Sequence, residues 1–228
     1  MPLEIGLLLF PRLTQLDLTG PFEVFSRLPD ARVRLLWKTT DPVRADTGLG
    51  LLPDTALAEC PQLDVVCVPG GPGVAAMMED AEVLGFLRRQ AAGARYVASV
   101  CTGALVLGAA GLLRGRRATT HWASHDFLAA LGATPVQARV VRDGKLFTGG
   151  GVTAGIDFAL TIAAEIAGAE VAQAIQLQIE YAPAPPFDAG RPETAPAEVL
   201  AAAQRRGAGM RAEREALVTR VAARLAEN

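Results

Sequence analysis

The stretch of sequence that most constrains the fold runs from residue 96 to residue 113 and carries no charged side chain. Its first part, Tyr96 to Val100, is rich in β-branched residues and predicts a short strand. Its second part, Ala104 to Ala110, has the small and aliphatic residues of a buried helix. Several glycines and hydroxyl residues within the stretch argue against a membrane span. The stretch therefore predicts a buried strand that turns directly into a buried helix.

Cys101 stands at the turn between this strand and this helix. A residue in that position lies at the carboxyl edge of a sheet, as in a nucleophile elbow, and Ser99 and Gly103 supply the small neighbours that the turn needs. The N–H groups and the positive dipole end of the following helix favour a thiolate. Because cysteine is also among the most often buried residue types, a core role and a nucleophile role both remain open from this stretch alone.

Length and composition suit one α/β domain with a large core and a small appendage, since the chain has 228 residues of which 50% are hydrophobic. The net charge of −2 gives no basic footprint, so we expect no nucleic-acid partner. Three cysteines are too few for a disulfide framework, and a reducing cytoplasm is the expected location. The apolar run Leu3 to Phe10 lacks a preceding basic region and predicts a first buried strand, not a signal peptide, and we expect no membrane partner.

Predicted strands and helices alternate along most of the chain. The strands are expected at 3–10, 33–39, 63–68 and 96–100, with a small β excursion at 43–52 and a hairpin at 136–148, and the helices at 81–92, 104–110, 122–131, 152–167 and 170–181. This order favours a mostly parallel, flavodoxin-like sheet with helices on both faces.

Two parts of the chain are expected to differ in character. Residues 1–181 should form the α/β domain that carries the elbow. In residues 182–228, a stiff proline-rich segment precedes an Ala- and Arg-rich tail with helical spacing. The tail is too short for a core of its own, so we expect it to dock on the domain or on a second copy of the chain.

Asp17 is a lone carboxylate among apolar neighbours, just after the first strand. In open parallel sheets ligands bind at the carboxyl edge, which favours a functional role for this residue. The alternative is a helix-capping role. We expect the helix itself to begin at Thr19 or Gly20, with Pro21 in its first turn.

Further candidates follow other predicted strands. Gly70 and Gly71 end the strand at 63–68, where glycine lets the backbone approach a ligand and leaves N–H groups free. His121 ends a short strand at 118–120. His121 and His125 have the spacing of a zinc pair, but the H-E-x-x-H frame is absent and we expect no metal. The carboxyl edge would collect Asp17, Gly70, Gly71, Cys101, Thr102 and, from its short strand, His121.

Six segments together resemble the ThiJ/PfpI superfamily, whose members share a glutamine-amidotransferase-like α/β sandwich. They are FPRLTQLDLTGPFEVF, VPGGPG, ASVCTGALVLGAAGLL, ATTHWASHDFL, FTGGGVTAGIDFAL and IEYAPAPPFDAG. Within the superfamily the chain is most similar to the isocyanide hydratases. The resemblance implies a homodimeric, cofactor-free enzyme that adds water to an isocyanide, R–N≡C, and gives an N-substituted formamide. It also implies that Cys101 is the nucleophile and Asp17 the acid/base.

Departures from other branches of the superfamily narrow this expectation. Many proteases of the superfamily carry His directly after the nucleophile, where this chain has Thr102, and deglycase or glyoxalase-like members usually carry Glu where it has Asp17. Related transcription regulators carry an added pair of helix-turn-helix units, for which the tail is too short.

The expected chemistry is a covalent thioimidate on Cys101, with one proton shared between Cys101 and Asp17. Backbone N–H groups of Thr102 and Gly71 are expected to stabilise developing charge, and the Thr102 hydroxyl to hold the geometry. Two alternatives stay open. The chain could be a non-catalytic sensor whose Cys101 is oxidised reversibly, or a glyoxalase/deglycase-like enzyme.

Overall fold

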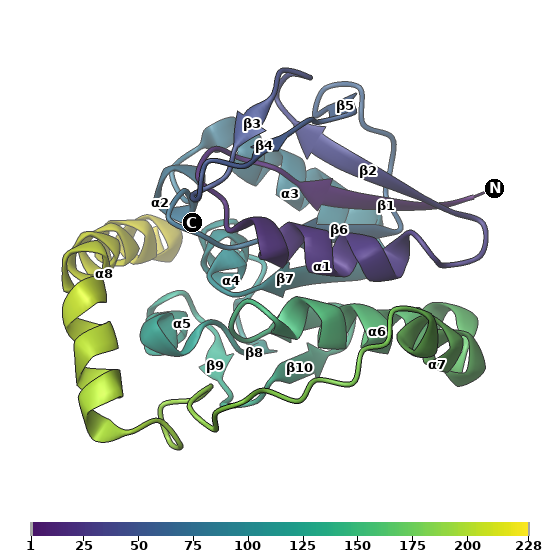
Figure 1. Ribbon diagram of the computed structural model, residues 1–228. Helices are drawn as coiled ribbons and strands as arrows, with labels where there is room; N and C mark the ends of the chain where they lie inside the picture. The colour runs from purple at the N-terminus through teal and green to yellow at the C-terminus, as the bar shows by residue number, and fades with distance from the viewer. Residues whose placement is uncertain (1, 228) are drawn as a thin grey trace.

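A seven-stranded sheet forms the centre of the computed structural model, which describes residues 2–227 (Figure 1). The strand order is β10-β11-β7-β6-β1-β2-β5. Six strands are parallel, namely β1 (Leu3–Leu8), β2 (Ala31–Trp37), β5 (Thr55–Ala56), β6 (Val65–Val68), β7 (Tyr96–Val100) and β11 (Leu146–Gly149), and β10 (Val140–Asp143) pairs antiparallel with β11. The predicted fold class is confirmed.

Helices cover both faces of this sheet (Figure 1). On one face α1 (Gln15–Phe25) packs against α6 (Ala154–Ala167), and on the other α3 (Ala81–Gly93) packs against α4 (Gly103–Ala109). The central strands β6, β7 and β11 are mostly apolar and almost wholly buried, as expected for a sheet covered on both sides. The remaining elements are β3 (Val43–Arg44), β4 (Gly50–Leu51), α2 (Val74–Met77), β8 (Arg117–Ala118), the 3₁₀ helix η1 (Trp122–Ser124), α5 (Phe127–Ala130), β9 (Thr134–Pro135), α7 (Ala169–Gln178) and α8 (Ala197–Ala226).

The chain reverses direction across the sheet between β1 and β6. From β1 it moves outward to β2, and it then returns to place β6 on the other side of β1. Such a switch point opens a crevice at the carboxyl ends of the two strands, where open α/β sheets bind ligands. The loops after β1, β6 and β7 therefore meet at one place.

Helix α1 begins earlier than predicted. It starts at Gln15, after Thr14, so Pro21 lies inside the helix and Asp17 lies in its first turn. Proline there removes the hydrogen bond to the carbonyl four residues back. The Pro21 ring is buried and packs closely against Gly155 of α6, which offsets that loss.

The predicted helix 122–131 is divided into η1 and α5. Around the division the N–H groups bond to carbonyls three residues back, from Ser124 to His121 and from His125 to Trp122. This tighter geometry is typical of short 3₁₀ segments. It changes which way the side chains after His121 point.

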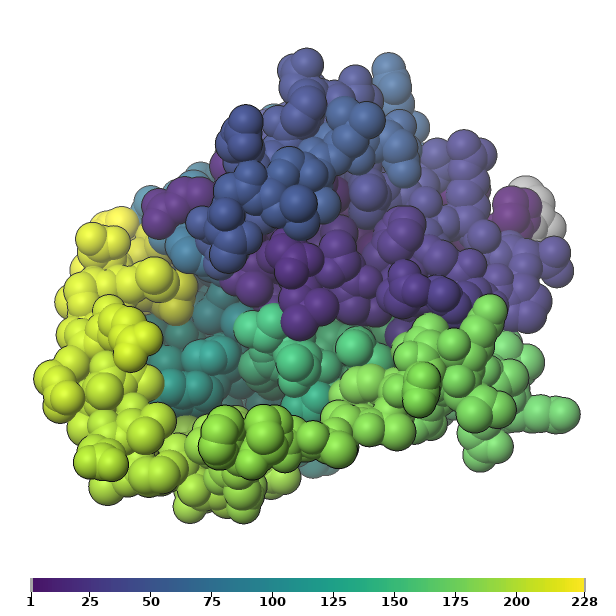
Figure 2. All heavy atoms as spheres, in the orientation of Figure 1, coloured from purple at the N-terminus to yellow at the C-terminus, as the bar shows by residue number. Residues whose placement is uncertain are grey.

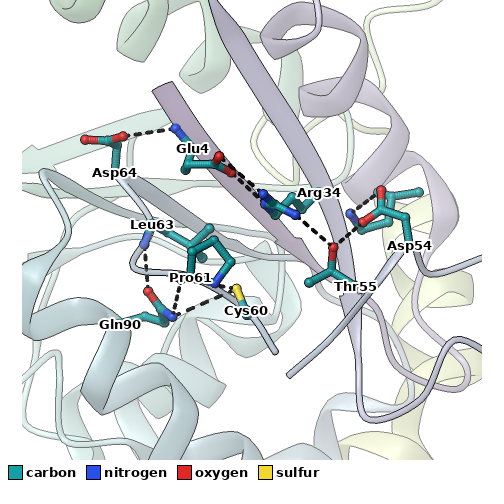
Figure 3. A network of polar contacts seen from close by, with 10 residues as sticks. Glu4, Arg34, Asp54, Thr55, Cys60, Pro61, Leu63, Asp64 and Gln90 are labelled. Carbon is teal, nitrogen blue, oxygen red and sulfur yellow. Dashed lines mark hydrogen bonds and ion pairs between the residues drawn. The ribbon is translucent and has the colours of Figure 1, made fainter. Parts of the chain in front are cut away.

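A polar network near the start of β1 ties three strands together (Figure 3). Arg34 donates two hydrogen bonds to the Glu4 carboxylate, at 2.6 and 3.2 Å, and a third to Thr55 of β5 at 3.4 Å. The Glu4 N–H in turn donates to Asp64 at 3.0 Å. These bonds fix the register of β1, β2 and β5 at the end of the sheet away from the crevice.

Helix α8 packs along one side of the domain, after the segment 182–196 has crossed the outside of the molecule (Figure 1). It packs mainly against α4, α5 and η1. Leu217, Val218 and Val221 are its buried apolar side chains, and all lie in its C-terminal half. Within residues 2–227, none of the helices combines the length and the apolar character needed to cross a membrane.

We predict that Gly103→Ala lowers the free energy of unfolding by about 1–3 kcal/mol, since a Cβ at position 103 would lie 2.7 Å from the Pro69 carbonyl oxygen. The matched control is Gly209→Ala in α8, where a Cβ meets nothing within 4 Å. That variant should gain about 0.5–1 kcal/mol, because alanine favours a helix over glycine. Urea unfolding midpoints measure both changes, and an unchanged midpoint for Gly103→Ala would contradict the tight packing of the elbow.

Candidate active site

Cys101 sits on a strained backbone at the end of β7. Its φ of +54° lies in the left-handed region, which is costly for a residue other than glycine. The Cys101 N–H donates to the carbonyls of Gly149 and Gly150, at 3.1 and 2.7 Å. The Cys101 carbonyl accepts a hydrogen bond from the Thr120 hydroxyl at 2.6 Å. Three hydrogen bonds thus hold the conformation that directs the thiol toward the crevice.

Asp17 reaches the crevice from the first turn of α1 and is fully buried. Its Oδ2 accepts a hydrogen bond from the Gly70 N–H at 2.8 Å, and its side chain is hydrogen-bonded to the Cys101 thiol. Its Oδ1 has no partner among residues 2–227. The carboxyl therefore does not cap α1; it is held between Gly70 and Cys101.

Thr102 follows the elbow and faces the same crevice. Its Oγ1 accepts a hydrogen bond from the Gly71 N–H at 3.0 Å. Its backbone N–H and its side chain both lower the pKa of the Cys101 thiol, and its hydroxyl makes a long hydrogen bond, at 3.5 Å, to the Gly71 carbonyl. The Gly71 N–H is thus engaged by Thr102 and not directed at a reacting atom, which differs from the expected role of that group.

Burial raises the pKa of both members of the Asp17–Cys101 pair. The pKa of Asp17 rises to about 7 because burial outweighs the hydrogen bonds from Gly70 and Cys101. Burial and the nearby Asp17 carboxylate raise the pKa of the Cys101 thiol, and these effects exceed the opposing effect of Thr102. The position of Cys101 at the start of α4 and its burial therefore act on the pKa of the thiol in opposite directions. The pair titrates as a unit that resists a second negative charge.

His121 lies in the wall of the crevice and also caps η1, because its Nδ1 accepts a hydrogen bond from the Ala123 N–H at 3.3 Å. Burial, and then the Arg214 cation, lower the pKa of His121. The imidazole is therefore neutral near pH 7. His125 belongs to no metal-binding group, since residues 2–227 contain no cluster of three or more His, Cys, Asp or Glu able to hold a metal.

A cleft of about 620 Å³ opens over Cys101, within the range of small-molecule sites. Helix α8 forms one side of the cleft, and Figure 2 shows the recess between α8 and the body of the molecule. The lining residues are Thr14, Gly71, Pro72, Cys101, Thr102, His121, Trp122, Ala123, Val152, Ala203, Gln204, Gly207, Met210, Arg211 and Arg214. Asp17 and Gly70 are not part of this lining; Gly70 is hydrogen-bonded to Asp17, and Asp17 is hydrogen-bonded to Cys101.

Sequence reasoning missed three residues of the site. Thr120 was placed only in a short strand, although its hydroxyl holds the elbow. Trp122 was expected only in a helix, and Arg214 was not singled out from the other residues of the tail; both line the cleft. For Arg214 one signal was available, since it lies three residues before Leu217 and so on the apolar stripe of α8.

The other two cysteines lie elsewhere. Cys67 is fully buried within β6, and burial raises the pKa of its thiol. Cys60 contacts Gln90 at 3.9 Å in the network of Figure 3, and burial raises the pKa of its thiol to about 11. Neither lines the cleft. Cys101 is thus the cysteine whose surroundings combine a carboxyl partner, hydrogen-bond donors and an adjoining cavity.

A cysteine elbow on a covered parallel sheet, with a buried carboxyl beside it, defines a class of cysteine-centred α/β domains. The chain belongs to the DJ-1/PfpI family, whose model matches residues 4–165. It is 61% identical over 225 residues to the isonitrile hydratase of Pseudomonas putida, covering 99% of each chain.

Solved structures agree with this placement. A ThiJ/PfpI family protein from Pseudomonas syringae superposes with a TM-score of 0.93 at 44% identity, over 96% of this chain and 91% of that one. Drosophila melanogaster DJ-1beta superposes with a TM-score of 0.73 at 29% identity, over 79% of this chain and 98% of that one. The P. syringae match extends over nearly the whole chain, whereas the DJ-1beta match leaves about a fifth of it uncovered.

We predict that Asp17→Asn changes how stability depends on pH. Because the pKa of Asp17 is raised to about 7, the folded protein keeps a proton that the unfolded chain loses above about pH 4. The free energy of unfolding of the wild type should therefore fall as pH rises from about 4 to about 7. Asn cannot ionise but still accepts from Gly70, so the variant should be the more stable protein at about pH 8, by up to about 4 kcal/mol.

Urea unfolding of both proteins at about pH 4 and about pH 8 measures this difference. Asp188→Asn, which removes an exposed carboxylate, is the control for the loss of one charge. If Asp17→Asn is the less stable protein at about pH 8, the carboxyl serves mainly to hold the fold.

Proposed function

We propose that the protein is an isocyanide hydratase that adds water to R–N≡C and releases an N-substituted formamide, with Cys101 and Asp17 at the reacting carbon. Isonitrile is another name for isocyanide, and the observation that carries the proposal is the full-length, 61% identity to the P. putida isonitrile hydratase. The contact between Cys101 and Asp17 in one buried site supports it. The chemistry is that of a cysteine-dependent lyase.

The first half of the reaction uses the proton that the pair holds. The terminal carbon of an isocyanide accepts a nucleophile and a proton on the same atom. With the single proton of the pair on Asp17, the Cys101 thiolate attacks this carbon while Asp17 delivers the proton to it, which gives the thioimidate R–N=CH–S on Cys101 and leaves Asp17 as a carboxylate. The raised pKa of Asp17 supports this step, because it keeps an acid available near neutral pH.

The second half restores the pair. Asp17, now a carboxylate, takes a proton from water as the oxygen attacks the thioimidate carbon, and passes that proton to the nitrogen. The resulting R–NH–CH(OH)–S intermediate collapses, the C–S bond breaks and Asp17 takes the hydroxyl proton. The products are R–NH–CHO and Cys101 with its original proton count.

Thr102 and Gly70 assist the Cys101–Asp17 pair by hydrogen bonding and do not themselves react. The Thr102 N–H and hydroxyl stabilise negative charge on the departing or attacking sulfur. The Gly70 N–H fixes one carboxyl oxygen of Asp17, which leaves Oδ1 free to exchange a proton. Trp122 and Val152 give the cleft apolar surface for the R group.

We also infer that the protein works in the cytoplasm as a homodimer. The reduced state of Cys101 that the chemistry needs supports the first point. Two large apolar side chains, Leu177 and Phe187, are 81% and 77% exposed in the single chain, which supports the second. Phe187 belongs to residues 182–228, for which we expected docking on the domain or on a second copy of the chain.

We predict multiple turnovers of a simple alkyl isocyanide to its formamide by the wild type, measured by infrared spectroscopy. Cys101→Ala should reduce turnover to the uncatalysed level, because no thioimidate can form. Asp17→Asn should lower kcat by about 10²–10⁴-fold, because both proton transfers lose their carrier. Cys60→Ser, which changes a cysteine outside the cleft, is the matched control and should match the wild type.

No turnover by the wild type on several isocyanides would contradict the proposal. One-for-one oxidation of Cys101 by peroxide, without formamide production, would favour a redox sensor. Turnover of methylglyoxal with the same dependence on Cys101, again without formamide, would favour a glyoxalase/deglycase-like enzyme.

We predict a solution mass of twice the 23.8 kDa chain by sedimentation equilibrium. Replacing Leu177 and Phe187 together with Ser should shift the protein toward the single-chain mass, because apolar burial drives association. Leu52→Ser, at another exposed apolar side chain, is the control and should leave the mass unchanged. A wild type that sediments as one chain would contradict the homodimer.

A further inference from the structure

Arg214 lies in the wall of the cleft and has no part in the chemistry proposed above. It belongs to α8, is only 8% exposed and lines the same cleft as Cys101. It shares the buried face of α8 with Leu217 and Val221. An apolar residue at this position would complete that face, whereas a buried cation loses its hydration and needs compensation from its surroundings.

The contacts of Arg214 supply little compensation. One Nη donates to the Ser124 hydroxyl at 3.0 Å, and the other contacts the Met210 sulfur, a weak acceptor, at 3.7 Å. The buried Nε has no hydrogen-bond partner within residues 2–227. None of the ion pairs formed in that part of the chain includes Arg214. A guanidinium has five N–H donors, so most of those of Arg214 are unused.

Arg211, one turn away in the same wall, shows the contrast. It forms an ion pair with Asp126 at 2.6 Å and donates to the Ala123 carbonyl at 2.7 Å. Its charge is therefore balanced locally. The lining of the cleft contains these two arginines and neither Asp nor Glu. Asp17, which is not part of this lining, is largely protonated below about pH 7. The charge that the Cys101–Asp17 pair holds acts on Arg214 from across the cleft, but the lining offers its guanidinium no carboxylate partner.

We propose that Arg214 binds a carboxylate of the substrate, so that the preferred isocyanides carry a carboxylate group at the end away from the isocyano carbon. This inference rests on the proposed hydratase function and specifies its substrate class. A carboxylate can accept two parallel N–H bonds from one guanidinium, and it would supply the direct partner that the lining lacks. An uncharged alkyl group would leave the buried cation unpaired. Arg214 is then a residue that determines specificity.

The test compares isocyanides that differ only in charge. Isocyanoacetate is matched by 2-methylpropyl isocyanide, and 3-isocyanopropanoate by 3-methylbutyl isocyanide, since a carboxylate and a branched alkyl end have similar shapes. The wild type should favour at least one carboxylate over its partner by about tenfold or more in kcat/KM. Arg214→Leu should abolish this preference while keeping turnover of the alkyl isocyanides, and Arg214→Lys should keep part of it.

Arg220→Gln is the matched control. Arg220 lies on the same helix as Arg214 but outside the cleft, and the substitution removes a cation from an exposed ion pair with Glu79. It should retain the wild-type preference. The proposal is overturned if the wild type turns over the alkyl isocyanides and shows no preference for either carboxylate, or if Arg214→Leu loses both kinds of substrate equally. Absence of turnover on all four compounds would instead be a failure of the hydratase function.

A binding measurement tests the carboxylate subsite independently of catalytic turnover. N-formylglycine, the formamide expected from isocyanoacetate, should bind the wild type about tenfold or more tightly than it binds Arg214→Leu in calorimetry. N-(2-methylpropyl)formamide should bind the two proteins alike. Equal binding of N-formylglycine to wild type and variant would overturn the carboxylate subsite, whatever the activity measurements give.

Discussion

The left-handed backbone of Cys101 is the constraint on which the rest of the site depends. A non-glycine residue keeps such a conformation only where its surroundings determine it fully. Here the end of β11 accepts the N–H and Thr120 donates to the carbonyl. The same turn brings the Thr102 N–H to the sulfur and requires Gly103 beneath the end of β6. The nucleophile, its donor and the start of α4 are therefore one structural unit, fixed by two neighbouring strands.

The burial of the two reacting side chains is the second feature on which the site depends. Asp17 is fully buried and Cys101 nearly so, and burial disfavours the charged form of each. The pair responds by holding a proton, which is what addition to an isocyanide carbon needs. Arg214 brings the opposite charge into the same cleft from a different layer of the fold. Cys101 and Arg214 both line the cavity, so a substrate that carries a carboxylate can contact the cation while its isocyano carbon meets the sulfur.

Much of this arrangement was predictable because it is local in sequence. The strand, the turn and the helix around Cys101 are adjacent in the chain, and the alternation of strands and helices predicted the parallel sheet and its carboxyl edge. The start of α1 was not predictable in the same way. Proline favours the first turn of a helix, and only the tertiary contact of Pro21 with α6 explains its place inside one. At this position tertiary packing outweighs the preference of proline for the first turn of a helix.

The parts that sequence reasoning missed depend on contacts between distant residues. Thr120 reaches Cys101 across 19 positions, and Arg214 reaches Ser124 across 90. No local pattern encodes such a contact. The spacing of Leu217 and Val221 indicated that the tail is helical and has a buried face, but it could not say which surface that face meets. Only the docking of α8 beside the crevice gives Arg214 its surroundings.

The two halves of α8 have different roles, and this difference determines which substitutions the protein can accumulate during evolution. Its apolar anchors, Leu217, Val218 and Val221, all lie in the C-terminal half, whereas Ala203, Gln204 and Gly207 line the cleft from the largely exposed N-terminal half. Substitutions at those three positions reshape the mouth of the cavity while the anchors go on holding the helix. Natural proteins are only marginally stable, so substitutions that alter substrate range are tolerated best where they do not destabilise the fold, as at these positions. The N-terminal half of α8 is thus the part of the cleft wall that can vary while the rest of the site is kept.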